Sequence, residues 1–200
     1  KMRKVKENEE NDRIRNSVDE FYRKISTNEY KTEISPEEVS SSLGYSEEMM
    51  RQLPKGSDMG LSCGNPLENL ELGVGEVLID LGCGAGKDLF LTRMKYPFSG
   101  TLYGMDRLSE MISKAERMRD MKKFENIEFR QGTLTSMPFK SGSIDKAISN
   151  CVINLEPEKQ HVYNELYRIL KPGGKFYISD IMLKRDLPEE WKKKEKMHNT

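Results

Sequence analysis

The residues whose types and spacing most clearly suit a chemical role form a glycine-rich segment in the first half of the chain. Residues 77–86 read V-L-I-D-L-G-C-G-A-G. An apolar stretch that runs into closely spaced glycines predicts a buried strand, a tight turn and the start of a helix. Glycine permits the turn and lets a ligand approach the backbone without meeting a Cβ atom. The segment therefore predicts a cofactor-binding loop made of Gly82, Cys83, Gly84 and Gly86.

The spacing of this loop indicates which cofactor it suits. An acid, Asp80, stands two residues before the first glycine, and the glycines follow G-x-G-x-G instead of the G-x-G-x-x-G of dinucleotide sites. S-adenosylmethionine (SAM) has no pyrophosphate, so the helix N-terminus would face its methionine carboxylate. Asp80 would attract the ammonium, and Asp106, at the end of the next expected strand, would accept hydrogen bonds from the ribose. A dinucleotide site and a plain tight turn are the alternatives.

Further candidates follow from the rule that ligands bind outside the carboxyl ends of parallel strands. Residues after the third expected strand should lie along the adenine, and residues after the fourth should face the methyl group. Arg107 is assigned to the same site as the neighbour of Asp106. The additional candidates are Arg107, Gly132, Thr133, Leu134, Asn150 and Cys151.

The elements that must position these residues alternate between strands and helices. Strands are expected at 76–81, 101–105, 127–131, 144–149 and 175–181, and helices up to about 94, at 109–121 and at 156–170. This alternation predicts right-handed crossovers and a mostly parallel sheet, that is, a Rossmann-like α/β fold. The turn K-P-G-G at 171–174 should precede the fifth strand.

The N-terminal part has a different pattern. Apolar residues recur at helical spacing from Ile14 to Ile25, Ser35-Pro36-Glu37-Glu38 is typical of a helix start, and a short helix should run from Ser46 to Leu53. We expect residues 1–60 to form a helical lid or collar and residues 61–183 to form the cofactor-binding core. Residues 184–200 should form a charged C-terminal helix or tail.

The amino-acid composition limits the classes of partner that the protein is expected to bind. The 200 residues contain 33 Lys and Arg and 33 Asp and Glu, so no net charge favours nucleic acid or an anionic membrane. No apolar stretch is long enough for a membrane span, and the charged start lacks the apolar region of a signal peptide. The three scattered cysteines predict reduced thiols in a cytoplasmic protein. A small-molecule substrate is therefore expected.

Several of these segments together resemble the arsenite methyltransferases, which are class I SAM-dependent methyltransferases. The resemblance covers about Tyr45 to Glu190. The most specific segments are Cys63-Gly64-Asn65-Pro66 and residues 149–155, which read S-N-C-V-I-N-L. Residues 104–106 and 168–174 match as well, and Phe21-Tyr22-Arg23-Lys24 looks like the aromatic helix that closes over SAM in the family.

The resemblance implies methylation of trivalent arsenic, with Cys63 and Cys151 at the positions of the arsenic-binding cysteines and a thiol reductant as a partner. Arsenic(III) is soft, and thiolates are the soft ligands of proteins. The family usually carries another cysteine in its N-terminal helices, where this chain has none before Ser62, and one beyond the fifth strand. We expect a C-terminal region with that cysteine and two further strands beyond Thr200. Thr135 stands where many relatives have an acid.

Each singled-out residue also has a structural interpretation. Cys83 lies between glycines, where a small residue is needed, and a free cysteine is commonly a small buried apolar residue. The spacing of Cys63 and Cys151 does not show whether they meet. His161 and His198 should lie on the surface, while Met111, Met118 and Met121 should fill the core.

Three other functions remain open. A SAM-dependent methyltransferase that acts on an organic small molecule would not need the two cysteines. A SAM-binding module without turnover would bind the cofactor and transfer nothing. A nicotinamide-dependent oxidoreductase is disfavoured by the glycine spacing.

Overall fold

A single parallel sheet forms the centre of the computed structural model, which describes residues 2–27, 34–182 and 184. Its five strands lie in the order β3-β2-β1-β4-β5, and every neighbouring pair is parallel. This arrangement confirms the expected Rossmann-like α/β fold. The strands are β1 (Leu78–Leu81), β2 (Leu102–Asp106), β3 (Ile127–Gln131), β4 (Ile144–Asn150) and β5 (Leu170–Ser179).

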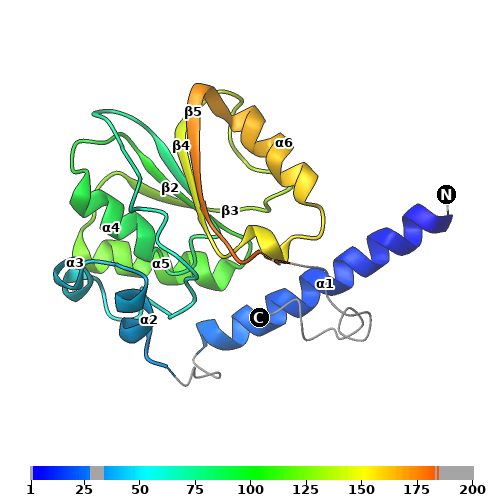
Figure 1. Cartoon of the computed structure of the whole chain (residues 1–200), viewed down its shortest axis with the longest axis horizontal. Coiled ribbons are helices and arrows are strands. Elements are labelled where there is room, and N and C mark those ends of the chain that lie inside the picture. Colours follow the sequence, from blue (N-terminus) through cyan, green and yellow to red (C-terminus); the bar gives the residue numbers. More distant parts are fainter. Residues whose placement is uncertain (1, 28–33, 183, 185–200) are drawn as a thin grey trace.

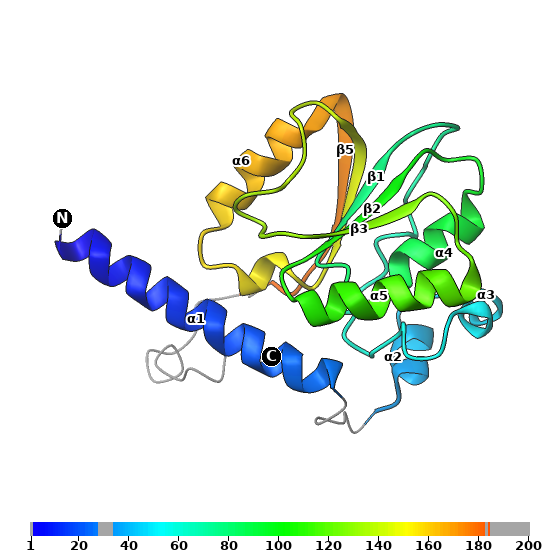
Figure 2. The same ribbon diagram turned by 180° about the vertical axis from the view of Figure 1, so that it is seen from behind.

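Helices cover both faces of this sheet. Helices α4 and α5 lie on one face and α6 lies on the other, as Figures 1 and 2 show. Within the described residues, no helix is long and apolar enough to cross a lipid bilayer. The helices are α1 (Met2–Ser26), α2 (Pro36–Ser42), α3 (Glu47–Gln52), α4 (Lys87–Lys95), α5 (Ser109–Lys122) and α6 (Lys159–Ile169), with a 3-10 turn η1 (Ile153–Leu155) after β4.

Alternation along the strands divides the core into two layers. Leu78 packs with Leu89 and Phe90 of α4, whereas the next residue, Ile79, packs with Val162 of α6 on the opposite face. Successive side chains of a strand point to opposite faces, so strands covered on both sides are apolar throughout. Tyr45, between α2 and α3, belongs to the α4 layer. The segment before the sheet is therefore packed into the same core.

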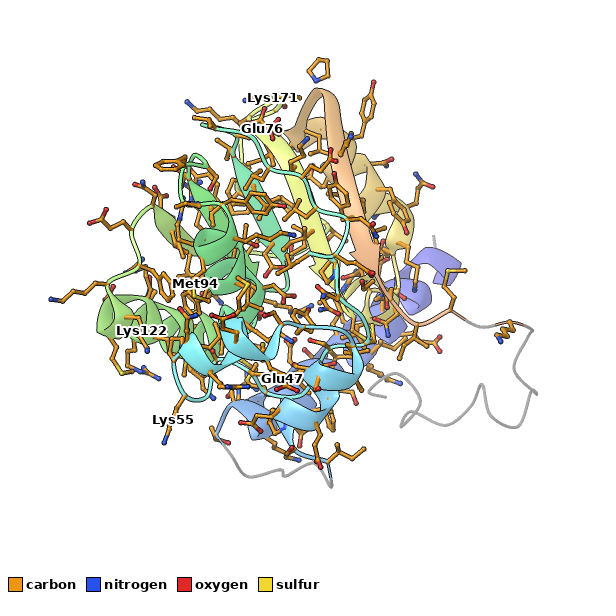
Figure 3. All side chains as sticks on the ribbon, turned by 60° about the vertical axis from the view of Figure 1, so that its left-hand side comes forward. Glu47, Lys55, Glu76, Met94, Lys122 and Lys171 are labelled. Atoms are coloured by element: carbon orange, nitrogen blue, oxygen red, sulfur yellow. The ribbon has the colours of Figure 1, made fainter. Side chains whose placement is uncertain are left out.

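Helix α1 lies across the carboxyl ends of the strands, away from Glu76 and Lys171 at the other end of the sheet (Figures 1 and 3). Ion pairs join it to the body of the protein. Arg15 bonds Glu156 at 2.7 Å, and Asp19 bonds Arg107 at 3.0 Å. The expected amphipathic helix is thus present, and it covers the end of the sheet where ligands bind in such folds.

Two element boundaries differ by three or more residues from those expected. Helix α6 begins at Lys159 instead of residue 156. Glu156 is instead the C-cap of the 3-10 turn η1, and its carboxylate bonds Arg15 of α1. Strand β5 begins at Leu170, before the expected K-P-G-G turn. Ile144 pairs with Leu170 but Lys146 pairs with Lys175, so residues 171–174 form an irregularity within the strand instead of preceding it.

The expected burial or exposure of individual side chains is only partly confirmed. Met111 and Met118 are buried as expected, but Met121 is 67% exposed, so its placement in the core was wrong. Met111 and Met118 are two helical turns apart and share one face of α5, whereas Met121 is turned by about 60° from Met118 and is the penultimate residue of the helix. His161 is on the surface as expected. His198 and the tail at 185–200 lie outside the described residues.

Arg93 of α4 joins this helix to the turns before β2 and β3. Its guanidinium donates to the carbonyls of Ser99 (3.2 Å), Gly100 (2.8 Å) and Asn126 (2.9 Å). We expect Arg93→Met to lower the free energy of unfolding by about 2–4 kcal/mol, because these carbonyls would be left without their donor. Arg51→Met is the control: this exposed residue should change stability by less than about 0.5 kcal/mol. Equal effects of the two changes in urea unfolding would contradict this account.

Candidate active site

The carboxyl ends of β1, β2 and β4 open into a cavity that α1 covers. The sheet order reverses between β1 and β4, and ligands bind at such a switch point. Most of the residues expected from the sequence line this cavity. They are Asp80, Gly82, Cys83, Gly84, Asp106, Arg107, Gly132, Thr133, Leu134, Asn150 and Cys151. Gly86 and Cys63 are not part of its lining.

The glycine-rich loop turns as the sequence predicts. Gly82 has a φ of 70° and donates its N–H to the Met105 carbonyl at 2.7 Å, which holds the loop against β2. A Cβ atom on Gly82 would lie 2.4 Å from Cγ2 of Val152. The glycine is thus required by both the left-handed backbone and a close protein neighbour. Gly86 has a φ of 88° and is the N-cap of α4, so it turns the chain without lining the cavity.

Asp106 closes the loop from the end of β2. Its Oδ2 accepts the N–H of Gly84 and its Oδ1 accepts the N–H of Leu108, both at 3.0 Å. Burial raises the pKa of Asp106, and these backbone donors oppose the rise. The carboxylate is therefore held in one orientation at the cavity wall, with lone pairs left for a ligand.

Asp80 adds a second carboxylate at the end of β1. It is 3% exposed, and burial together with the negative charges of Asp88 and Asp106 raises its pKa, while Lys87 lowers it. Like charges in a poorly solvated site disfavour the ionised carboxylate. A ligand that brings a positive charge would relieve this repulsion, so the electrostatics favour a cationic group beside Asp80.

Asn150 ties the end of β4 to the segment that carries Cys63. Its Nδ2 donates to the Tyr45 hydroxyl at 2.9 Å, to the Gly64 carbonyl at 3.1 Å and to Asp88 Oδ2 at 3.1 Å. Its Oδ1 accepts the Cys63 N–H at 3.3 Å. The Tyr45 hydroxyl donates to Asp88 Oδ1 at 2.8 Å. Although Asn150 borders the cavity, its side-chain amide makes hydrogen bonds to other segments of the protein and holds them together.

The two candidate cysteines meet at this point. The sulfur atoms of Cys63 and Cys151 and a carboxylate oxygen of Asp180 all lie within 4.8 Å of one another. Cys151 has a φ of 58°, which is uncommon for a residue with a side chain, and donates its N–H to the Ser179 carbonyl at 2.8 Å. The Cys63 thiol donates to the same carbonyl at 3.5 Å. Only Cys151 of the pair also borders the cavity.

The proximity of the two thiols separates their pKa values. A hydrogen bond from Cys151 lowers the pKa of Cys63, and the same bond raises the pKa of Cys151. A thiolate is stabilised by a donor, whereas losing a second proton beside it is disfavoured. Burial raises the pKa of Cys83, which stays a structural thiol between glycines. Cys63 is therefore the thiol that ionises first.

Sequence reasoning missed other residues of this region. Asp180 comes directly after β5, and Asp106 stands at the end of β2. The shared position of an acid at the carboxyl end of a strand could have identified Asp180 as a candidate. Lys87 lines the cavity, bonds Ser62 Oγ at 2.6 Å and lies 4.0 Å above the Tyr45 ring. For Lys87, no local pattern marks the role. Tyr22 of α1, in contrast, belongs to the aromatic segment that the resemblance singled out. It lines the cavity too, and burial and the charges of Cys151, Cys63 and Asp106 raise its phenol pKa.

Comparison with known proteins supports this interpretation of the cavity. The methyltransferase domain family matches residues 72–200. The arsenite methyltransferase of Halobacterium salinarum is 41% identical over 76% of this chain, and the human arsenite methyltransferase is 37% identical over 56%. The chain spans 39% and 32% of the lengths of these two relatives. The resemblance to arsenite methyltransferases is confirmed.

A solved structure extends the similarity to the fold. An arsenic(III) S-adenosylmethionine methyltransferase from Chlamydomonas reinhardtii superimposes with a TM-score of 0.57 at 27% identity. The match covers 80% of this chain and 53% of that one. The similarity in fold therefore extends over most of this chain.

The thiol pair generates a testable prediction about reactivity. We expect iodoacetamide to modify Cys63 before Cys151 and Cys83, since the thiolate is the nucleophile and Cys63 has the lowered pKa. Cys151→Ala removes the donor, so the pH profile of Cys63 alkylation should move to higher pH. Peptide mass spectrometry measures the rates, and Cys83→Ala serves as the control with an unmoved profile. An unchanged profile in Cys151→Ala would show that the two thiols are not coupled.

Proposed function

Because the chain belongs to the methyltransferase domain family, we propose that it transfers a methyl group from SAM to trivalent arsenic held by the thiolates of Cys63 and Cys151. The observation that carries the proposal is that these two sulfurs meet, although the residues lie far apart in the sequence. Cys151 also borders the cavity that suits SAM. The names and similarity of the arsenite methyltransferases support the choice of arsenic.

The residues of the cavity fit SAM. The buried carboxylate of Asp80 lacks enough positive charge around it to hold its pKa down, which suits the ammonium of the methionine part. Asp106 is fixed by backbone donors and offers acceptors for two ribose hydroxyls. The apolar side chains of Met105, Leu108 and Leu134 in the lining suit the adenine. When bound, SAM supplies a methyl group activated by a sulfonium.

Cys63 and Cys151 would bind the acceptor. Each thiol that bonds to arsenic replaces one hydroxyl of arsenous acid, and its proton leaves with that hydroxyl as water. The lowered pKa of Cys63 favours the first of these two steps, since the thiolate is the ligand. Two sulfur ligands leave the arsenic lone pair free, and the protein need only orient it and exclude water.

The segments around the pair provide that orientation. Asn150 holds the Cys63 segment, and the Ser179 carbonyl accepts the Cys151 N–H. Tyr22 of α1 lies near both cysteines and Asp106, where it would exclude water between cofactor and acceptor. We propose that α1 acts as a lid over this space. Residues 61–183 would then form the catalytic core.

Partners follow from the arsenic chemistry. A new carbon bond made with the arsenic lone pair oxidises arsenic(III) to arsenic(V), so repeated methylation requires a reductant. A small thiol could both reduce arsenic and deliver it by exchange onto the cysteines. All three cysteines are free, which suits the reducing cytoplasm.

Methylation of arsenite provides the direct test of the acceptor. With labelled SAM, arsenite and excess thiol, we expect methylated arsenic from this chain and at least about a hundredfold less from Cys63→Ser and from Cys151→Ser, because a serine hydroxyl is a poor ligand for a soft ion. Both variants should bind SAM as the parent does, which controls for misfolding.

Three results would separate the alternatives. Undiminished methylation by both variants would contradict the thiolate mechanism. Transfer to organic acceptors with none to arsenite would favour the organic-substrate methyltransferase. SAM binding without transfer to any acceptor would favour a binding module.

The electrostatics of Asp80 predict how SAM binding depends on pH. Asp80 must be ionised to hold the ammonium, and its raised pKa means that it protonates at a higher pH than an ordinary aspartate. Affinity should therefore be full above that pKa and fall as the pH drops through it. Asp80→Asn should weaken binding about tenfold to a hundredfold and remove this acid dependence.

Calorimetric titration with SAM at several pH values measures this dependence. Asp120→Asn is the control, because Asp120 is exposed on α5 and should leave the profile intact. Retention of the acid limb in Asp80→Asn would assign the titration to another group.

A further inference from the structure

We propose that Cys63, Cys151 and Asp180 also form a binding site for a thiophilic divalent cation, represented by Cd²⁺ or Zn²⁺. The site itself requires no methyl transfer. Its consequence, that such a cation competes with arsenic for the two thiolates, rests on the proposed function. Asp180 distinguishes a divalent cation from arsenic. Two thiolates from the protein suffice to hold arsenic, whereas a divalent cation takes more than two protein ligands.

The positions of the three ligand atoms suit a tetrahedral ion. The two sulfurs and the Asp180 oxygen lie within 4.8 Å of one another. An ion with bonds of about 2.3 Å to sulfur and about 2.1 Å to oxygen holds tetrahedral ligands roughly 3.6–3.8 Å apart. Small side-chain adjustments would therefore close the site, and the fourth position would be left for water.

Each ligand is held in place by the surrounding backbone. The Asp180 carboxylate accepts the Asn154 N–H at 3.0 Å on Oδ2 and the Ile181 N–H at 2.8 Å on Oδ1. Asn150 anchors the backbone of Cys63, and Ser179 anchors that of Cys151. Ligands fixed in this way lose little freedom when an ion binds, and such supporting bonds orient metal ligands.

The charges at this point favour a cation. The Asp180 carboxylate places a negative charge beside both sulfur atoms. An ion of charge +2 would relieve the repulsion between the carboxylate and two thiolates. Two sulfurs and one oxygen are the donors that Zn²⁺ and Cd²⁺ accept, whereas Mg²⁺ and Ca²⁺ require oxygen.

The test is a Cd²⁺ titration of the reduced chain without SAM or arsenic. Thiolate-to-cadmium charge-transfer absorbance in the ultraviolet should rise to one ion per chain. It should be lost in Cys63→Ser and in Cys151→Ser and require at least about tenfold more Cd²⁺ in Asp180→Asn. Cys83→Ala should titrate as the parent does, because this buried thiol is outside the cluster.

Circular dichroism of every variant distinguishes a lost ligand from a lost fold. Undiminished absorbance in the Cys63→Ser and Cys151→Ser double variant would overturn the site. Equal Cd²⁺ affinity in folded Asp180→Asn would overturn the assignment of Asp180. Arsenite added to the cadmium-loaded chain should bleach the absorbance. A chain that binds Cd²⁺ in this way but methylates no arsenic would disprove the proposed function and leave the cation site standing.

Discussion

The side-chain amide of Asn150 makes the contacts on which the geometry of the site depends. It stands at the end of β4 and bonds three segments that are distant in sequence: Tyr45 before α3, the Cys63–Gly64 turn, and Asp88 in α4. Asp88 is the second residue of α4, which begins directly after the glycine-rich loop, so the same amide links this loop with the cysteine segment. A buried amide that loses such partners costs about 1–3 kcal/mol for each unsatisfied group. The relative position of the glycine-rich loop and the two cysteines is thereby fixed by the protein alone.

The turn after β4 completes this arrangement at some cost in backbone energy. A residue with a side chain in the left-handed region costs about 1–2 kcal/mol, and Cys151 has a φ of 58°. The turn places Cys151 beside Cys63 and the next side chain, Val152, against Gly82. One change of backbone direction thus supports both the thiol pair and the cofactor loop. Strain of this kind persists where the surroundings over-determine it, which is common at functional sites.

What the sequence could predict was local. The strands, the glycine turn and the acids at the ends of β1 and β2 follow from periodicity and spacing, and these predictions agree with the structure. The proximity of Cys63 and Cys151 could not be predicted in this way, because it depends on side-chain hydrogen bonds of Asn150 across the fold. The start of α6 was missed for a related reason, since Glu156 bonds Arg15 of a helix far away in sequence. Contacts between residues that are distant in sequence produce no periodic pattern in the sequence.

The way α1 is attached bears on its proposed role as a lid. Arg23 and Glu110 form a pair whose side chains are 50% and 39% exposed, so water and salt weaken it. The pair of Arg15 with Glu156 is different, because their side chains are only 16% and 8% exposed, so water and salt screen it much less while the helix is closed. A lid must open for ligands yet close in one position. The exposed Arg23–Glu110 pair resists opening little, while the desolvated Arg15–Glu156 pair beside the cavity specifies where the helix returns. The same pair would be hydrated whenever α1 lifts, so closure and exclusion of water from the site would occur together.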